Sequence, residues 1–323
     1  MTHPSGIIVG GGIGGLCAAG SLQRVGIDVR VYEVAPALKP VGAGIMMAPN
    51  AMRVFENLGI ADAVKACGVS LKRLVVSDQR GRVLQTMDGQ VIERKFGNPI
   101  TAIHRADLHR ILLERLEGDV VRLGRRCVAC HQTAERVVAA FEDGSEESGD
   151  FLVGADGLRS VVRQALFPSA RLRYAGQTCW RGVLMTSLPD GSFDTSTERW
   201  GCGLRVGFLP IGGGKVYWYA TANRDAGGVD DGDTRAKLLE LFRDPALAFR
   251  QYELRRKRKA NRIIRESRRF GWIAAIEHPA LCTLRNRLIR WTPEFVTRRH
   301  IAWVFSAADQ RRSTRRFVTH SSV

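Results

Sequence analysis

The segment at residues 7–15, Ile-Ile-Val-Gly-Gly-Gly-Ile-Gly-Gly, constrains the fold of this chain more than any other. Its three apolar residues predict a short buried strand, and the glycines that follow predict a tight turn that opens a helix. Gly10, Gly12 and Gly15 have the G-x-G-x-x-G spacing, which lets backbone approach a pyrophosphate. The helix N-terminus adds free N–H groups and a partial positive charge. The segment therefore predicts a dinucleotide-binding turn.

The residues after this turn complete a nucleotide-binding unit. Apolar side chains recur on one face of the predicted helix, and a second strand follows at residues 29–33. This strand ends in Glu33, which lies 21 residues after Gly12, where a carboxylate can accept a hydrogen bond from a ribose hydroxyl. The unit predicts that an adenine dinucleotide binds here. A glycine-rich turn in which Glu33 only ends a strand is the alternative interpretation.

The length of the chain allows a large core. At 323 residues, about two domains are expected. No secretory leader precedes the first strand, and no stretch approaches the ~20 apolar residues of a membrane span. Seven scattered cysteines do not form a disulfide framework. We therefore expect a soluble protein of the reducing cytoplasm.

Positive charge is concentrated near the end of the chain. Residues 251–323 hold 18 Lys/Arg and 5 Asp/Glu, so they carry +13 of the net charge of +17. The centre is Arg-Arg-Lys-Arg-Lys at residues 255–259, within a segment of helical character at residues 245–270. Because the run has no interleaved aromatic residues, it favours a solvated helix face. Nucleic acid and an anionic membrane are the weaker alternatives, and no nucleic-acid partner is expected.

Two segments read as strands of an antiparallel sheet. Residues 71–100 and 171–221 alternate apolar and polar side chains between turns. A glycine-rich turn at residues 210–214 joins two of these strands into a hairpin. Arg205 and Tyr217 are predicted to share one face of the hairpin, because alternate side chains of a strand point the same way.

A second strand–turn–helix unit lies at residues 151–160, Phe-Leu-Val-Gly-Ala-Asp-Gly-Leu-Arg-Ser. A buried strand here ends in small residues and a new helix starts, which is the pattern of a second ligand-facing turn. A helix that begins at Arg105 precedes it, with Leu108, Ile111 and Leu112 on one apolar face.

Residues 127–131, Cys-Val-Ala-Cys-His, match the pattern for covalent haem attachment, and C-x-x-C also occurs in redox and zinc sites. The surrounding residues alternate as in a strand, and no second cysteine pair lies nearby. The segment is therefore predicted to be a strand interior without a cofactor or metal. His104 and His109 are expected to cap or cover a helix rather than to catalyse.

Several motifs follow one another in this chain: the unit at residues 10–33, Gly-Ala-Gly-Ile at 42–45, Arg-Ala-Asp-Leu at 105–108 and Gly-Ala-Asp-Gly-Leu-Arg-Ser at 154–160. In this order they resemble the motifs of FAD-dependent aromatic hydroxylases of the p-hydroxybenzoate hydroxylase class. Trp-Arg-Gly at 180–182, Trp-Gly at 200–201 and Tyr-Trp at 217–218 are similar to strands of the salicylate-type and urate-type hydroxylases.

The resemblance implies an α/β fold with a Rossmann-like FAD-binding domain, an antiparallel β-sheet substrate domain and a C-terminal helical region. The FAD-binding domain is expected at residues 1–70 and 101–170, and the substrate sheet at residues 71–100 and 171–232. C-terminal helices are expected at residues 233–308, followed by a basic tail at 309–323. The oligomeric state stays open, with a homodimer as one candidate assembly.

The resemblance also implies a role for individual residues. Cofactor contacts fall on the glycine turn, the second strand, the 43–44 backbone, the helix start and the second turn: Gly10, Gly12, Gly15, Glu33, Ala43, Gly44, Arg105, Asp156 and Gly157. Asp156 would also serve the approach of NAD(P)H, the co-substrate. Substrate contacts fall on Met47, Arg205 and Tyr217.

The implied activity is hydroxylation of a small aromatic or heteroaromatic ring by an FAD-dependent monooxygenase. NAD(P)H reduces the flavin, oxygen is captured as a C4a-hydroperoxide, and the hydroxyl group passes to the ring. Because this chemistry is centred on the flavin, no side chain is assigned as catalytic and no metal is expected.

The chain departs from the family in one respect. Members carry an apolar strand that ends in Gly-Asp between the substrate sheet and the basic helix, and this chain has no such segment there. Its Gly-Asp pairs begin at Gly118, Gly149 and Gly232, in unrelated contexts. Two alternatives therefore stand beside a monooxygenase. One is a flavin- or nucleotide-binding remnant without hydroxylase activity, and the other is an NAD-dependent dehydrogenase.

Overall fold

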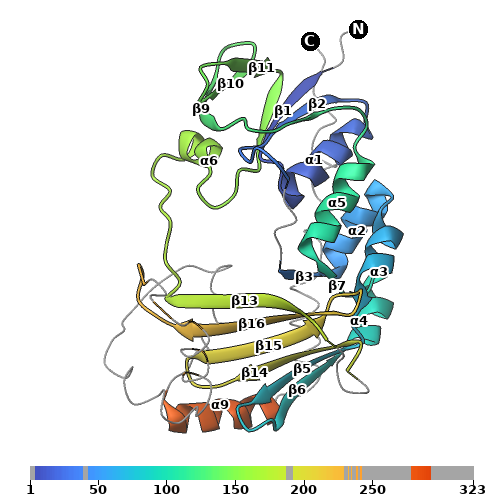
Figure 1. Cartoon of the computed structure of the whole chain (residues 1–323), viewed down its shortest axis with the longest axis vertical. Helices are drawn as coiled ribbons and strands as arrows, with labels where there is room; N and C mark the ends of the chain where they lie inside the picture. The colour runs from blue at the N-terminus through green and yellow to red at the C-terminus, as the bar shows by residue number, and fades with distance from the viewer. Residues whose placement is uncertain are drawn as a thin grey trace, which may run out of the picture.

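The computed structural model describes residues 4–38, 43–186, 192–228 and 278–291, together with residues 232, 234, 238 and 241. Figure 1 shows a parallel sheet at the top of the molecule and a six-stranded sheet at the bottom. A stack of helices runs between them along one side. The chain passes from the upper part to the lower sheet, returns, and then passes down again.

The upper sheet has four parallel strands in the order β12-β1-β2-β8. They are β1 (Ser5–Val9), β2 (Asp28–Tyr32), β8 (Val121–Arg122) and β12 (Phe151–Gly154). Helix α1 (Ile13–Gln23) connects β1 to β2. Ile8 and Val31 on the sheet and Ala19 on α1 are fully buried in one cluster. The first predicted unit is therefore a strand–helix–strand crossover packed on a parallel sheet.

The helical stack consists of α1 with α2 (Pro49–Leu58), α3 (Ala61–Cys67) and α5 (Arg105–Arg115). Their apolar faces form one core that includes Leu16, Met52, Phe55, Leu108 and Leu112. A small antiparallel sheet lies below the stack in the order β3-β7-β4. Its strands are β3 (Gly44–Met47), β7 (Thr101–His104) and β4 (Val69–Ser70).

A three-stranded antiparallel sheet lies beside the parallel sheet, in the order β11-β10-β9. The strands are β9 (Cys127–Gln132), β10 (Val137–Phe141) and β11 (Glu146–Gly149), and helix α6 (Val161–Leu166) packs near β9. Residues 127–131 all lie in β9, so the cysteine pair is part of a strand, as predicted. Within the part of the chain that the structure describes, no cluster of His, Cys, Asp and Glu could hold a metal ion.

The lower sheet has the strand order β13-β16-β15-β14-β5-β6. Its strands are β5 (Arg73–Asp78), β6 (Val83–Asp88), β13 (Gln177–Met185), β14 (Thr195–Trp200), β15 (Leu204–Pro210) and β16 (Lys215–Asn223). Neighbouring strands are antiparallel except for β14 and β5, which are parallel. Strands from residues 71–100 and from residues 171–223 thus join in one sheet, as predicted.

The prediction that residues 71–100 consist only of strands is wrong in its last third. Helix α4 (Gly89–Phe96) follows β6 directly. The Asp88 carboxylate caps it by accepting hydrogen bonds from the backbone N–H groups of Gln90 and Val91. Asp followed by Gly reads as a turn in the sequence, but an aspartate before a helix is also a preferred N-cap.

Helix α9 (Pro279–Trp291) falls within residues 233–308, where C-terminal helices are expected, and it lies beside the lower sheet. A disulfide joins Cys282 on α9 to Cys202, although the scattered cysteines gave no sign of a pairing. The Arg285 guanidinium donates to the carbonyl oxygen of Gly201 (3.2 Å), and burial lowers its pKa to about 10. The two cysteines are 80 residues apart in sequence, so only the packing of α9 brings them together.

The predicted basic helix at residues 245–270, the helix expected after residue 292 and the basic tail lie outside the described residues. Among the described helices, none is long and apolar enough to cross a membrane.

Candidate cofactor and substrate site

The glycine turn between β1 and α1 is close-packed on one side. Gly10 has a positive φ of 107°, which favours glycine, and a Cβ there would overlap the carbonyl group of Ala155. A Cβ at Gly15 would overlap the carbonyl oxygen of Gly10. Both positions therefore need the absence of a side chain for the turn to close against β12.

The other side of the turn is open. Gly12 is the N-cap of α1, with extended backbone, and a Cβ built on it would have no atom within 4 Å. No side chain caps α1, so the N–H groups of its first turn face the same open space. These groups and the positive end of the helix dipole suit an anion. The turn therefore fits the pyrophosphate of a dinucleotide such as FAD.

Glu33 lies directly beside this turn. Its Oε2 accepts a hydrogen bond from the Gly11 N–H (2.7 Å), and its Oε1 accepts one from the Ala35 N–H (2.9 Å). Each carboxylate oxygen has a further lone pair, so Glu33 can still accept from a ribose hydroxyl. His109 Nε2 lies 2.7 Å from the carbonyl oxygen of Gly11 and holds the turn from the α5 side. The sequence predicts only that His109, four residues after Arg105, caps or covers a helix, and it does not predict this contact with the glycine turn.

The second predicted turn adjoins the first, because β12 pairs with β1 and the Ala155 N–H donates to the Val9 carbonyl oxygen (2.8 Å). Asp156 accepts from the Ser160 hydroxyl (2.5 Å) and from the Val161 N–H (2.6 Å), so it caps α6. Gly157 has a positive φ of 80°, which lets the chain reverse before the helix. In this arrangement Asp156 stabilises the turn, and its contact with FAD stays a prediction.

Strand β3 brings the 43–44 backbone towards α5. The Arg105 N–H donates to the Ala43 carbonyl oxygen (3.0 Å), while the exposed Arg105 guanidinium forms no ion pair with the carboxylates that the structure describes. Met47 packs in the helical core with 9% of its surface exposed, whereas Met46 on the opposite face is 45% exposed. The predicted substrate contact of Met47 therefore falls on a buried side chain and stays a prediction.

One face of the lower sheet meets β3. A Cβ at Gly44 would lie 2.5 Å from the Cβ of Tyr217, so the missing side chain at Gly44 lets Tyr217 pack against this backbone. Nearby, Lys215 Nζ on β16 lies 3.4 Å from the Asp107 carboxylate on α5. The Tyr217 face of the sheet is therefore turned towards the nucleotide-binding part of the molecule.

Arg205 shares this face with Tyr217, as predicted. In the register of β15 and β16, Arg205 lies opposite Thr221 and Leu209 lies opposite Tyr217. Thr221 and Tyr217 are four residues apart on β16, and residues at an even spacing along a strand point to the same face, so Arg205 and Tyr217 share a face. The Arg205 Nε donates to the Thr221 hydroxyl (3.2 Å), and its Nη2 donates to Gln177 Oε1 (3.3 Å).

Sequence reasoning missed two residues of this face, Glu198 and Tyr219. Glu198 Oε1 on β14 lies 3.6 Å from Arg205 Nη1, and Glu198 accepts hydrogen bonds from the Tyr219 hydroxyl and from Trp200 Nε1. Burial and the Glu198 charge raise the Tyr219 pKa above its ordinary value. Period-2 alternation places Tyr219 beside Tyr217, but the pairing of β14 with β15 was needed to bring in Glu198.

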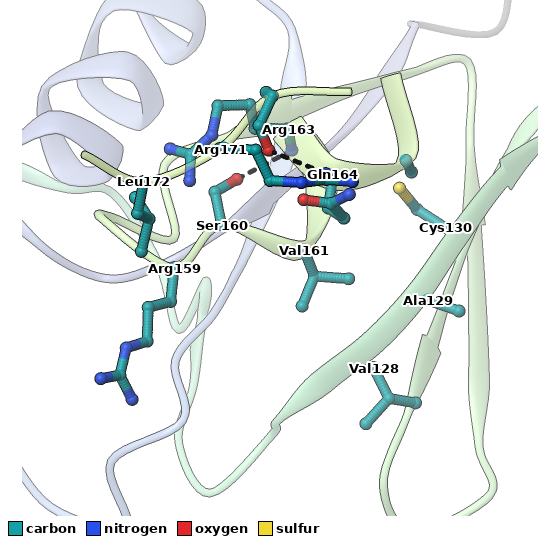
Figure 2. A pocket seen from close by; sticks show the side chains of 12 residues that line it. Val128, Ala129, Cys130, Arg159, Ser160, Val161, Arg163, Gln164, Arg171 and Leu172 are labelled. Carbon is teal, nitrogen blue, oxygen red and sulfur yellow. Dashed lines mark hydrogen bonds between the residues drawn. The ribbon is translucent and has the colours of Figure 1, made fainter. Parts of the chain in front are cut away.

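A further hollow of about 580 Å³ lies between β9 and α6 (Figure 2). Cys130 projects from β9 on one side, and Arg163 on α6 is bonded back to the carbonyl oxygens of Gly157 and Leu158. None of the residues predicted to bind cofactor or substrate lines this hollow.

Comparison with known families decides what kind of nucleotide site this is. A family model described as FAD binding domain matches residues 5–194, which is more than half of the chain. The chain belongs to this FAD binding domain family. The match spans both predicted turns and supports FAD as the cofactor of this chain, while the contacts of the glycine turn and Glu33 with FAD stay predictions. It does not support the NAD-dependent dehydrogenase alternative.

Curated proteins with named activities are similar to this chain. It is 41% identical over 237 residues to aurachin C monooxygenase/isomerase from Stigmatella aurantiaca, covering 73% of this chain and 61% of that protein. It is 36% identical over 240 residues to an FAD-dependent urate hydroxylase from Klebsiella pneumoniae, covering 73% of this chain and 62% of that protein. The chain therefore spans about three fifths of the length of these curated relatives.

Solved structures show the same fold. The structure of Klebsiella pneumoniae HpxO complexed with FAD and uric acid superposes with a TM-score of 0.68 at 32% identity, covering 74% of this chain and 61% of that chain. The family match and this superposition confirm the predicted α/β fold and the resemblance to FAD-dependent aromatic hydroxylases.

Proposed function

We propose that this protein is an FAD-dependent monooxygenase that hydroxylates an aromatic or heteroaromatic ring with NAD(P)H and oxygen. The observation that carries the proposal is the contact between Gly44 and Tyr217. It joins the strand that follows the FAD-binding unit to the sheet face that holds Arg205. Cofactor and ring can therefore meet at this junction.

FAD, when bound, supplies the redox chemistry by accepting electrons from NAD(P)H and activating oxygen. The chain supplies binding and orientation. The N–H groups at the start of α1 hold the pyrophosphate, Glu33 accepts from the ribose, and the exposed Arg105 offers a cation for a phosphate or the ribityl chain. Asp156 keeps the second turn in place by capping α6.

The face around Tyr217 is suited to a planar ring. The Tyr217 and Tyr219 rings lie 5.8 Å apart between centroids, and both pack against a buried cluster that includes Leu209 and Ile211. Such a wall excludes water from the reacting ring, and Arg205 can donate a hydrogen bond to an acceptor on it. Met47 is the weaker of the proposed substrate contacts, because its side chain packs in the helical core rather than on this face.

The second candidate is a flavin-binding protein without hydroxylase activity. It rests on a missing motif: the sequence after the lower sheet lacks the apolar strand ending in Gly-Asp that members of the family carry. Residues 242–277, where the basic helix is expected, lie outside the described part of the chain. Both candidates predict bound flavin, and only the first predicts turnover.

Purification of the full chain separates the two. A yellow protein with near-unit flavin, and NAD(P)H oxidation that an aromatic ligand stimulates, supports the monooxygenase. Bound flavin without stimulated oxidation supports the second candidate. A colourless, folded protein that binds no flavin contradicts both.

Arg205→Ala tests the substrate assignment. We expect the apparent affinity for the stimulating ring to fall, because a donor on the Tyr217 face is lost. Arg199→Ala is the matched control, since Arg199 is an exposed arginine on β14 whose position alternates with Glu198 and so lies on the other face. Equal affinities for the two variants contradict the assignment.

The location and assembly of the protein belong to the same proposal. A cytoplasmic location is part of the proposal, because NAD(P)H is available there. A homodimer is the candidate assembly, and light scattering of the purified chain measures the oligomeric state.

A further inference from the structure

Glu198 is a carboxylate on the proposed substrate face for which the function above has no use. It comes from β14, two residues before Trp200, and its side chain is 22% exposed. Arg205, with 23% of its side chain exposed, is the cation beside it at 3.6 Å. The arginine that is proposed to meet the substrate thus already has an anionic neighbour.

The fold holds Glu198 in this position by two donors. Tyr219 on β16 reaches Glu198 on β14 by lying across β15 at Gly207, where a Cβ would overlap the Tyr219 ring. Trp200 Nε1 donates to the other carboxylate oxygen at 2.5 Å. The Tyr219 hydroxyl is protonated and is a donor at neutral pH, as an ordinary tyrosine is, and burial together with the Glu198 charge raises its pKa further.

Arg205 keeps hydrogen-bonding capacity in spite of this neighbour. Arg205 has five N–H groups. One donates to Thr221 and one donates to Gln177, and we assign a third, on Nη1, to the ion pair with Glu198. Two N–H groups therefore remain for a ligand. The site can donate hydrogen bonds, but Glu198 offsets the charge that would attract an anion. Arg181, also on this side of the sheet, is exposed to solvent, which screens its charge.

We propose that Glu198 is a specificity-determining residue that makes the substrate face select an uncharged ring with a carbonyl or hydroxyl acceptor over a ring that carries a carboxylate. This inference rests on the proposed function, because it requires the ring to bind at the Tyr217 face. A carboxylate placed at Arg205 would also lie near Glu198 and meet like-charge repulsion.

The test compares two ligands of almost equal shape, 2-hydroxybenzamide and 2-hydroxybenzoate, near neutral pH. Their dissociation constants are measured by titration calorimetry on the full chain with excess FAD. Wild type is expected to prefer the amide. Glu198→Gln removes the charge and keeps the shape, with its amide oxygen able to accept from Trp200 Nε1 and its NH2 able to donate to the Tyr219 hydroxyl oxygen. It should shift the preference towards the benzoate by about tenfold or more.

Tyr219→Phe is the matched control, because it removes a hydrogen bond to Glu198 and leaves the charge. Its amide preference should equal that of wild type. If Glu198→Gln and wild type show the same preference, or if wild type prefers the benzoate, the role of Glu198 is refuted while the substrate site stands. If wild type binds neither ligand, the substrate site itself fails, and the role of Glu198 fails with it.

Discussion

The glycine turn offers a pair of substitutions that separate cofactor binding from folding. Gly12→Ala adds a methyl group on the open side of the turn, where no protein atom lies within 4 Å. The backbone at Gly12 has φ −73° and ψ 179°, which alanine adopts without strain. The stability of the apoprotein should therefore change by no more than about 0.5–1 kcal/mol.

The same methyl group stands where the pyrophosphate should approach the start of α1. Displacing a phosphate from one backbone N–H loses a hydrogen bond to a charged group, which is worth about 1.5–3 kcal/mol. We therefore expect FAD affinity to fall roughly ten- to hundredfold. Titration of the apoprotein with FAD, followed by flavin fluorescence, measures this change.

Gly15→Ala is the matched control, because it adds the same methyl group on the packed side. There the Cβ would overlap the Gly10 carbonyl oxygen, and overpacking of this kind costs about 1–3 kcal/mol. Urea denaturation should show the loss for Gly15→Ala and not for Gly12→Ala. If Gly12→Ala binds FAD as tightly as wild type, the open side of the turn is not the pyrophosphate site, and the reasoning is refuted.

Three further outcomes follow from single contacts. Gly207→Ala should push the Tyr219 ring from its place and lower the free energy of unfolding by about 1–3 kcal/mol in urea. Asp156→Ala should remove the acceptor of the Val161 N–H at the start of α6 and lower the thermal midpoint, with a cost of about 0.5–2 kcal/mol. Burial tends to raise the pKa of Asp78, but hydrogen bonds from Arg82 and Arg80 outweigh it and lower the pKa. Wild type should therefore lose stability as the pH falls below about 4, and Asp78→Asn should lose less in an acid titration of unfolding.

The nucleotide-binding part could be predicted from the sequence because its signals are local. Gly10, Gly12 and Glu33 lie within one strand–helix–strand unit, where spacing along the chain fixes spacing in space. The hairpin that places Arg205 and Tyr217 on one face is equally local. The strand–helix–strand unit from β1 to β2 and this hairpin therefore followed from periodicity and turn residues alone.

Other features depend on segments that are distant in sequence. Helix α4 was read as a strand because an Asp-Gly pair serves equally as a turn and as a helix start. Cys202 and Cys282 meet only because α9 packs beside the lower sheet. His109 touches Gly11 through the packing of α5 on the glycine turn, at a separation of 98 residues. These contacts cannot be predicted from a local sequence pattern, because their partners are far apart along the chain.

The sequence by itself determined the dinucleotide turn, the order of the motifs and hence the family, because these depend on residue types at short spacing. Only the tertiary structure decided the electrostatics of the substrate face. Glu198 reaches Arg205 through the pairing of β14 with β15, and Tyr219 reaches Glu198 across the bare backbone of Gly207. Strand register sets which side chains are neighbours across a sheet, and register is settled by the packing of the whole sheet rather than by one strand.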